Sequence, residues 1–451
     1  MKRGSSVLAR MFTMCSLHFR NGLLLLTPLA VAIAGLGGSY LFPLENDAIL
    51  YAKGGVDNPV SRLQERLDKG EVKLKHEDDY GYLSSVLKEL GISVRSQVLV
   101  FSKTSFQAPR IAPRTPRALY FNDHTAVGFV RTGDVLELAA LDAKQGIIFY
   151  TLKQNPVGHP RLERQDSCLQ CHQTGATMGI PGLMVRSITP DRNGMPVLTA
   201  GGFITDHRSA LKDRWGGWYV SGTSGQQGHM GNAVIRDFTN DDVRAPISEG
   251  APNVIRLRPY FDTGAYLTPH SDIVALMTLE HQTQMDNLMI RVGWEARVAM
   301  AENNAINKSL GEPEQQLRPS TQHRIDSAVE ELLEYILFSE EAKLTAPIEG
   351  TSGFREEFSK RGPRDAKGRT LREFDLKTRM FRYPCSFLIY SDAFDGMPPI
   401  VKIRLYRRLF HVLSEQDNGS KFAHLNQEDR RAIFEILKET KKGLPAYWLA
   451  S

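Results

Sequence analysis

Cysteine is scarce in this sequence: its 451 residues contain only Cys15, Cys168, Cys171 and Cys385. So few thiols, spaced so unevenly, cannot form a disulfide framework, and the fold must therefore depend on its hydrophobic core. Cys385 stands among aromatic residues at 381–387, where we expect a small, buried, apolar side chain. Only Cys168 and Cys171 are close enough in sequence to act as a pair.

An excess of one charge is also absent from most of the chain. The formal net charge is +5, but Lys2, Arg3, Arg10 and Arg20 all precede the first acidic residue, Glu45. Without these four, 52 Lys and Arg face 51 Asp and Glu. A protein that binds nucleic acid needs a basic surface, so this near-balance predicts that nucleic acid is not a partner.

The sequence has no internal repeat, no Walker phosphate loop and no dinucleotide-binding glycine motif. What it has is one short motif, Cys168-Leu169-Gln170-Cys171-His172. This spacing suits a single helical turn that carries both sulfurs to one edge of a porphyrin. The two thiols would add to its two vinyl groups, and His172 would be the proximal ligand of the iron.

Three other kinds of site use a Cys-x-x-Cys pair. A structural zinc site needs two more ligands, which histidines would supply, since only Cys15 and Cys385 remain and Cys15 precedes a hydrophobic segment. A redox-active dithiol usually lies in a βαβ unit, which the surrounding pattern does not indicate, and it gives His172 no role. A disulfide between Cys168 and Cys171 would close a very small ring. We therefore favour covalent haem.

The second axial ligand would decide what such an iron does. His229 and Met230 are the expected candidates, because they lie 57 and 58 residues after His172 in a glycine-flanked loop. Met178 and Met195 are further candidates, although Met178 is too near the motif to reach the opposite face of the ring easily.

Other polar and aromatic residues after the motif could face the ring. Trp215 and Trp218 lie between glycines and suit a pocket wall beside a flat cofactor, or equally a close-packed turn region. His207 and Arg208, beside Asp206, are the weak catalytic candidates, since an imidazole and a guanidinium above the iron could handle oxygen or peroxide. The same three residues could bind haem propionates or form a solvated turn.

The N-terminal residues 1–44 have the features of an export segment. A basic start is followed by an apolar run at 23–34, and Ala32-Ile33-Ala34 offers a signal-peptidase site. No charge interrupts residues 21–44, so the uncleaved segment could also span a membrane. We predict a signal peptide or an N-terminal anchor, with the rest of the chain in the periplasm or on the periplasmic side of the inner membrane.

Hydrophobic patterning predicts an α+β fold. Residues 45–160 form a β-rich domain, because short β-branched and aromatic runs alternate with turn residues as in an antiparallel sheet. Residues 161–235 form the haem-binding region, with only a short helix at the motif. Residues 236–451 are mainly helical, with His281 expected as a core histidine; the clearest helical patterns cover 269–300, 325–337, 401–413 and 426–442.

The Cys168-x-x-Cys171-His172 motif resembles that of the c-type cytochromes, and the resemblance covers these five residues only. It implies one covalent haem c, electron transfer and a redox partner protein. The chain is several times longer than a small electron-carrier cytochrome, and it lacks the second motif of the dihaem peroxidases. Two alternatives therefore stay open: a haem oxidoreductase acting on peroxide or another small oxidant, and a haem-based sensor of redox state or gas.

Overall fold

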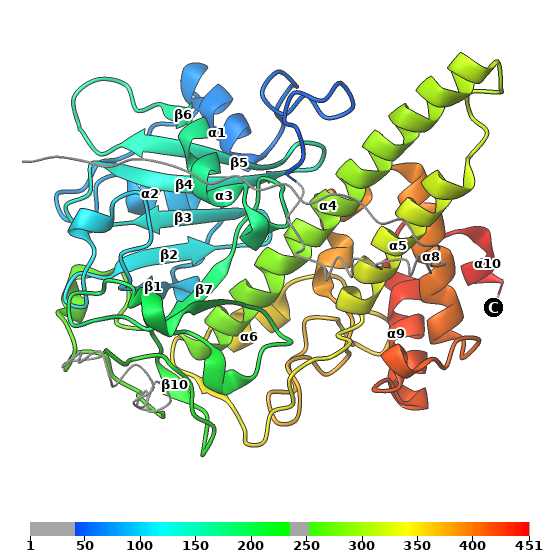
Figure 1. Cartoon of the computed structure of the whole chain (residues 1–451). Coiled ribbons are helices and arrows are strands. Elements are labelled where there is room, and N and C mark those ends of the chain that lie inside the picture. The colour runs from blue at the N-terminus through cyan, green and yellow to red at the C-terminus, as the bar shows by residue number, and fades with distance from the viewer. Residues whose placement is uncertain (1–40, 235–251, 451) are drawn as a thin grey trace, which may run out of the picture. The chain divides into compact units, whose positions relative to one another are not determined.

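The N-terminal half of the chain forms a seven-stranded antiparallel sheet in the computed structural model (Figure 1), which describes residues 41–234 and 252–450. The strand order is β6-β5-β4-β3-β2-β1-β9. The strands are β1 (Val98–Val100), β2 (Arg117–Phe121), β3 (Thr125–Phe129), β4 (Val135–Asp142), β5 (Gly146–Lys153), β6 (Leu162–Arg164) and β9 (Trp218–Tyr219). Consecutive strands are mostly neighbours, so the sheet is largely a meander closed at one edge by the later strand β9.

The two faces of this sheet meet different surroundings. Helix α1 (Pro59–Asp68) contacts β4 and β6, and the Asn58 side chain that caps it donates to the Tyr150 hydroxyl at 2.9 Å. A second short helix, α2 (Leu83–Glu89), adds Leu83, Val86 and Leu87 to the core. Residues on the other face of β1 to β5 line a cavity that is described below.

Two short ribbons complete the strands. One pairs β7 (Val185–Ile188) with β8 (Gly202–Thr205), and the other pairs β10 (Gly222–Thr223) with β11 (Glu349–Gly350). In the chain, β7, β8 and β10 lie between the cysteine motif and the long central helix, whereas β11 follows that helix.

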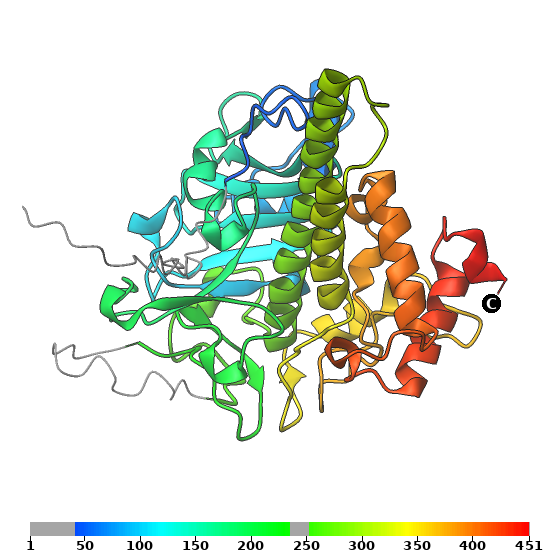
Figure 2. The same cartoon turned by 45° about the vertical axis from the view of Figure 1, so that its right-hand side comes forward.

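That central helix, α4 (Ile273–Leu310), is 38 residues long. Between Ile273 and Ile290 every residue except Gln284 is buried, so this half of the helix is enclosed on all sides. The Asp272 side chain caps its N-terminus by accepting from the backbone N–H groups of Val274 and Ala275. Figures 1 and 2 show why the helix is enclosed: it lies between the sheet and the remaining helices.

The remaining helices pack in sequence order beyond α4. Helix α5 returns beside α4, α8 packs on α5, and α9 packs on α8. Their bounds are α5 (Pro319–Ile336), α6 (Phe354–Lys360), α7 (Asp392–Asp395), α8 (Pro399–Leu413), α9 (Gln427–Thr440) and α10 (Ala446–Leu449).

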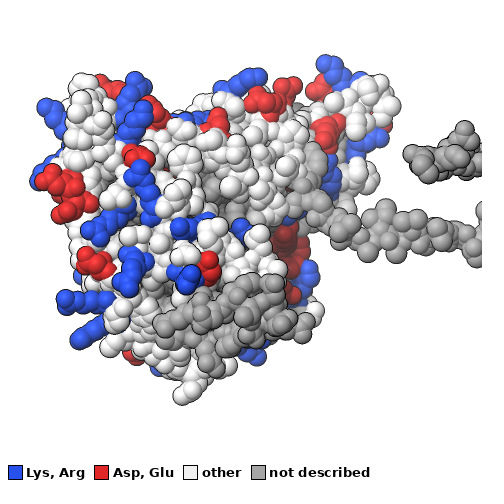
Figure 3. Space-filling view, turned by 60° about the vertical axis from the view of Figure 1, so that its left-hand side comes forward, with Lys and Arg blue, Asp and Glu red and all other residues white. Residues whose placement is uncertain are grey.

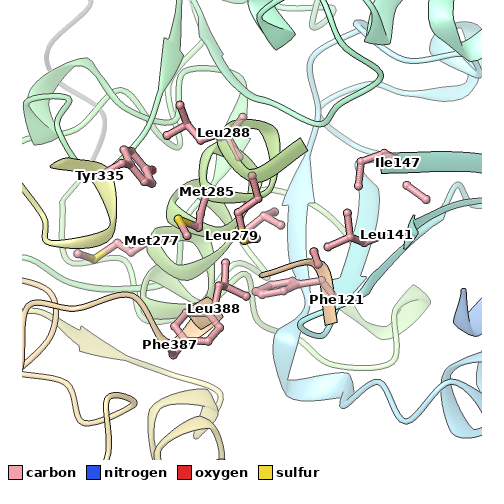
Figure 4. Close-up of a cluster of buried hydrophobic side chains, with 14 of the residues drawn as sticks. Phe121, Leu141, Ile147, Met277, Leu279, Met285, Leu288, Tyr335, Phe387 and Leu388 are labelled. Atoms are coloured by element: carbon pink, nitrogen blue, oxygen red, sulfur yellow. The ribbon is translucent and has the colours of Figure 1, made fainter. Parts of the chain in front are cut away.

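Figure 4 shows where the sheet and the helices share one core. Leu279 and Leu288 of α4 lie in it with Phe121, Leu141 and Ile147 of the strands and Phe387 from the C-terminal region. Burying a side chain of this size stabilises the fold by roughly 1.5–3 kcal/mol. The described residues accordingly belong to a single compact unit.

The predicted α+β fold is confirmed. Five of the strands lie within a few residues of their expected positions, and β6 and β9 of the same sheet come from the predicted region 161–235. Phe42, inside the predicted segment 1–44, is also buried, and its N–H donates to Gly179.

Residues 1–40 lie outside the described part of the chain, so the export segment stays a prediction. Among the helices of residues 41–234 and 252–450, none combines the length and apolar character that a membrane crossing needs.

Candidate haem site

The cysteine motif forms a single short helical turn, as its spacing predicts. A 3₁₀ turn at Asp166–Cys168 continues into α3 (Leu169–His172), directly after β6. Cys168 is half-buried, Cys171 is exposed, and both are free thiols. Burial raises the pKa of the Cys168 thiol. The two sulfurs are therefore presented together, unbridged, at one edge of the sheet.

His172 is held in one orientation by the chain that follows it. Its Nδ1 lies 2.9 Å from the carbonyl oxygen of Gly182, and the Gly182 N–H donates back to the His172 carbonyl at 2.9 Å. Burial lowers the pKa of His172, while the bond to Gly182 partly opposes this. A neutral imidazole whose Nδ1–H donates to a carbonyl keeps the Nε2 lone pair for a metal. Nε2 makes no hydrogen bond with the residues that the structure describes.

The motif stands at one end of a cavity of about 380 Å³. One face of the sheet makes the floor of this cavity. The floor residues alternate along the strands and lie on the same side in the observed register: Val100, Arg117, Leu119, Phe121, Ala126, Gly128, Glu137, Ala139, Phe149 and Thr151. Four strand spacings separate β5 from β1, or about 19 Å. The floor is thus broad and mostly apolar, as a large planar ring requires.

Two thiols and an imidazole lie at the motif end of the cavity. Cys168, Cys171 and His172 all line it, and the His172 ring lies 4.8 Å from the ring of Phe149 on β5. The segment Leu183–Arg186 and two residues of α4, Leu279 and Thr283, supply further walls.

The other end, near β1, is polar. Ser102, Thr104 and Ser105 line it, and the Ser105 hydroxyl oxygen is buried with no hydrogen-bond partner among the described residues. The hydroxyls of Ser102 and Thr104 lie 3.3 Å apart. Arg186, also at the cavity, is exposed to solvent. The cavity fits the amphipathic character of haem c. It has two thiols and an imidazole at one end, an apolar floor, and hydroxyls with a guanidinium at the other end.

An ion pair between Arg117 and Glu137 interrupts the apolar floor. Glu137 accepts from Arg117 and also from the side-chain amide of Gln107, the latter at 2.9 Å. Gly128 lies opposite Glu137 on β3, and a Cβ there would be 2.4 Å from the Arg117 guanidinium. Glycine therefore lets the Arg117 side chain cross the strand. The two side chains are only 18% and 15% exposed, so the pair carries a desolvation penalty that its close contact must offset.

Of the two tryptophans predicted beside the ring, the structure brings only Trp218 to the cavity. Its indole N–H donates to the Arg186 carbonyl at 2.8 Å. Trp215 is fully buried elsewhere, with its ring 5.3 Å from that of His229. Between the two, Gly217 adopts φ +87°, which reverses the chain and separates the tryptophans.

His229 and Met230, the expected second axial ligands, do not line the cavity. Both are buried; Gly231 N–H donates to His229 Nδ1 at 3.1 Å, and the Ser187 hydroxyl donates to the Met230 sulfur at 3.5 Å. Their glycine-flanked loop packs into the core instead of crossing the cavity. The methionine that does line the cavity is Met184, twelve residues after His172, which was not among the expected ligands.

Met178 and Met195, the further candidates for the second ligand, do not line the cavity either. The Met178 sulfur accepts from the side chains of Gln284 and Arg291, and Met195 is half-exposed at the surface.

His207 belongs to a buried network that includes residues of α4, whereas Arg208 is exposed, and neither residue lines the cavity. His207 Nδ1 lies 2.8 Å from Nδ1 of His281, and Arg208 pairs with Asp206 at 2.6 Å. β8 ends at Thr205, and the chain then turns into the core. The catalytic role considered for His207 and Arg208 therefore finds no support in their position, whereas the prediction of His281 as a core histidine is confirmed.

A second ion pair completes this network. Arg214 and Glu280, both almost fully buried, lie 3.2 Å apart, and Nε2 of His281 lies 2.8 Å from the Ser386 hydroxyl. The network joins β8, α4 and the C-terminal region, so its role is structural.

Comparison with family models, with curated proteins and with solved structures gives no match. Within residues 41–234 and 252–450, no three or more His, Cys, Asp or Glu side chains converge as a metal site, so the zinc alternative gains no further ligands there. The chemistry of the candidate site is therefore argued from its own residues.

The buried histidines predict an acid-sensitive fold. Burial lowers the pKa of His281 to about 3 and also lowers the pKa of His207, whereas an unfolded histidine has a value near 6.5. Their stabilising contribution is thus present above pH 6.5 and is lost as pH falls toward 4. Burial raises the pKa of Glu280 and of Glu341 to about 7 and raises that of Asp286 well above its usual value, so these three acids act in the opposite direction.

Between pH 7 and pH 5 we expect the buried, neutral His281 to lower the free energy of unfolding by about 2 kcal/mol. In calorimetry a His281→Gln variant should lack this loss, so its response to the same change of pH should differ from that of the wild type by this amount. His323→Gln changes an exposed histidine on α5 and should behave like the wild type. An equal pH dependence in all three proteins would contradict this assignment.

Proposed function

We propose that this chain is an exported single-haem c-type protein that transfers electrons through a covalently bound haem. The observation that carries the proposal is the position of the motif: Cys168 and Cys171 stand at one end of the apolar cavity, beside an imidazole with a fixed orientation. We also propose that residues 1–44 direct export, by a cleaved signal or a retained anchor, to the periplasm or the periplasmic side of the inner membrane. A redox protein is then the expected partner.

Each group at the site has a separate task. Cys168 and Cys171 would hold the ring by thioether bonds, and His172 would ligate the iron through Nε2 while Gly182 holds its Nδ1 proton. The floor of the cavity would exclude water from the ring. The hydroxyls near β1 and the Arg186 guanidinium would receive the propionates. Haem supplies the one-electron chemistry when it is bound.

A second candidate function depends on whether the iron would have a second protein ligand. His172 is the only imidazole that lines the cavity, and Met184 is its only methionine, among the described residues. With Met184 as ligand, the iron would have no open position and would act as an electron carrier. Without it, the site would bind a small oxidant such as peroxide, or a gas.

Covalent attachment is the first test. Expressed with its N-terminal segment in cells that attach haem c, the wild type should gain the mass of one haem. A Cys168→Ala/Cys171→Ala variant should gain none, because both thioether donors are missing. Cys385→Ala removes the remaining described thiol, which is buried away from the cavity, and should still carry haem. Intact-protein mass spectrometry measures this, and haem that stays covalently bound in the double variant would refute the proposal.

Carbon monoxide separates the two functions. If Met184 is a ligand, the reduced wild type should show a low-spin spectrum that carbon monoxide does not change, and Met184→Ala should bind carbon monoxide readily. Met195→Ala, which changes an exposed methionine, is the matched control. Ready binding by the wild type would instead favour the small-oxidant or sensor function, and peroxide turnover would then distinguish these two.

The Arg117–Glu137 pair should set the reduction potential. Ferric haem carries one more positive charge than ferrous haem, so a nearby carboxylate favours the ferric state and a guanidinium favours the ferrous state. We expect Glu137→Gln to raise the potential and Arg117→Gln to lower it in a spectroelectrochemical titration. Asp134→Asn, which removes the carboxylate of an exposed ion pair with Arg110, should have little effect because solvent screens it. Shifts of the same sign in both cavity variants would contradict this role.

A further inference from the structure

Exposed apolar side chains gather beside the cavity. Fourteen large hydrophobic residues are exposed in the described part of the chain, and four of them fall within residues 195–204. With Phe106, three of these residues form a set that we name the rim patch: Phe106 (72% exposed), Met195 (50%), Leu198 (86%) and Ile204 (40%). Phe203 precedes Ile204 on β8 and therefore faces the other side of the β7–β8 ribbon. Single exposed apolar residues need no explanation, whereas such a concentration indicates a binding surface.

Backbone contacts place the segments that carry these residues beside the lining of the cavity. Lys103 N–H donates to the Gly194 carbonyl at 2.8 Å, which joins the loop before Phe106 to the turn before Met195. Ile204 on β8 pairs with Arg186 on β7. Phe106 and Arg186 also line the cavity, so the rim patch borders the place where the haem would meet solvent.

The charges around the rim patch are mainly basic. Lys103, Arg114, Arg186 and Arg192 form no ion pair with any residue that the structure describes. The acid in this turn, Asp191, accepts hydrogen bonds from the backbone N–H groups of Asn193 and Met195. Elsewhere, basic and acidic side chains are interspersed, as Figure 3 shows for one face. The surroundings of the rim patch therefore favour a partner with acidic residues.

We propose that the rim patch is the docking surface for a small acidic electron-transfer protein, an inference that rests on the proposed haem function. The basic side chains would steer the partner by long-range attraction, and the apolar side chains would be desolvated in the complex. One electron would pass directly between the partner's cofactor and the haem, with no bond formed or broken. Docking at the cavity mouth keeps that transfer distance short.

Stopped-flow reduction of the ferric haem protein by flavodoxin hydroquinone, an acidic probe, tests the surface. One electron leaves the flavin and reduces the ferric iron, and the flavin is left oxidised by one electron. We expect a second-order rate constant that falls with salt, and a roughly tenfold lower value for Leu198→Ser/Ile204→Ser. Arg192→Glu should lower the rate and weaken its salt dependence. Leu310→Ser and Lys308→Glu, which change exposed residues at the far end of α4, are the matched controls.

The outcomes separate this proposal from the haem function. A wild type without a haem spectrum would refute the haem function itself. A normal haem spectrum and normal dithionite reduction, together with equal flavodoxin rates in rim-patch and control variants, would refute the docking surface alone. No reduction of the wild type by flavodoxin would also refute it. If the rim-patch variants instead lose only binding to phosphatidylglycerol-containing vesicles, the surface contacts a membrane and the proposal is wrong.

Discussion

An antiparallel sheet with two apolar faces must have both of them covered, and this requirement organises the chain. Helix α1 lies on one side of the sheet, and α4, enclosed between the sheet and the C-terminal helices, takes part of the other. The rest of that second face is the floor of the cavity, where small residues such as Ala126 and Ala139 leave space. The short turn that carries Cys168 and Cys171 stands at the edge of this space. A ring held by that turn would complete the cover of the sheet.

The size of the protein follows from the same constraint. A single haem could be enclosed by far fewer residues, but here the walls come from strands, from the Leu183–Arg186 segment and from α4. The buried network of His207, Arg214, Glu280 and His281 joins these parts, since it links the end of β8 to α4. Polar groups that were considered for chemistry thus serve to hold the cavity walls in place.

The elements that the sequence predicts correctly are those with local signals. The alternating strands of residues 98–153 and the helical pattern that becomes α4 depend on periodicity, and the motif turn depends on spacing over five residues. The failures are non-local. Gly217 turns Trp215 away from Trp218, and the loop with His229 and Met230 packs inward, although nothing in either segment reveals this. The pair of Arg117 and Glu137 was missed because the two are twenty residues apart and only the register of three strands, with glycine at 128, brings them together.

The position of the cavity residues also limits how the iron could be ligated. The chain after His172 turns back at once, because the Gly182 carbonyl accepts from the same imidazole that would bind the iron. The floor offers apolar side chains, Thr151 and the Arg117–Glu137 pair, which is already engaged. A strong second ligand would therefore have to come from the Leu183–Arg186 segment, where Met184 is the one soft donor among the described residues. Because this segment is also a wall of the cavity, its position would control the access of a small molecule to the site.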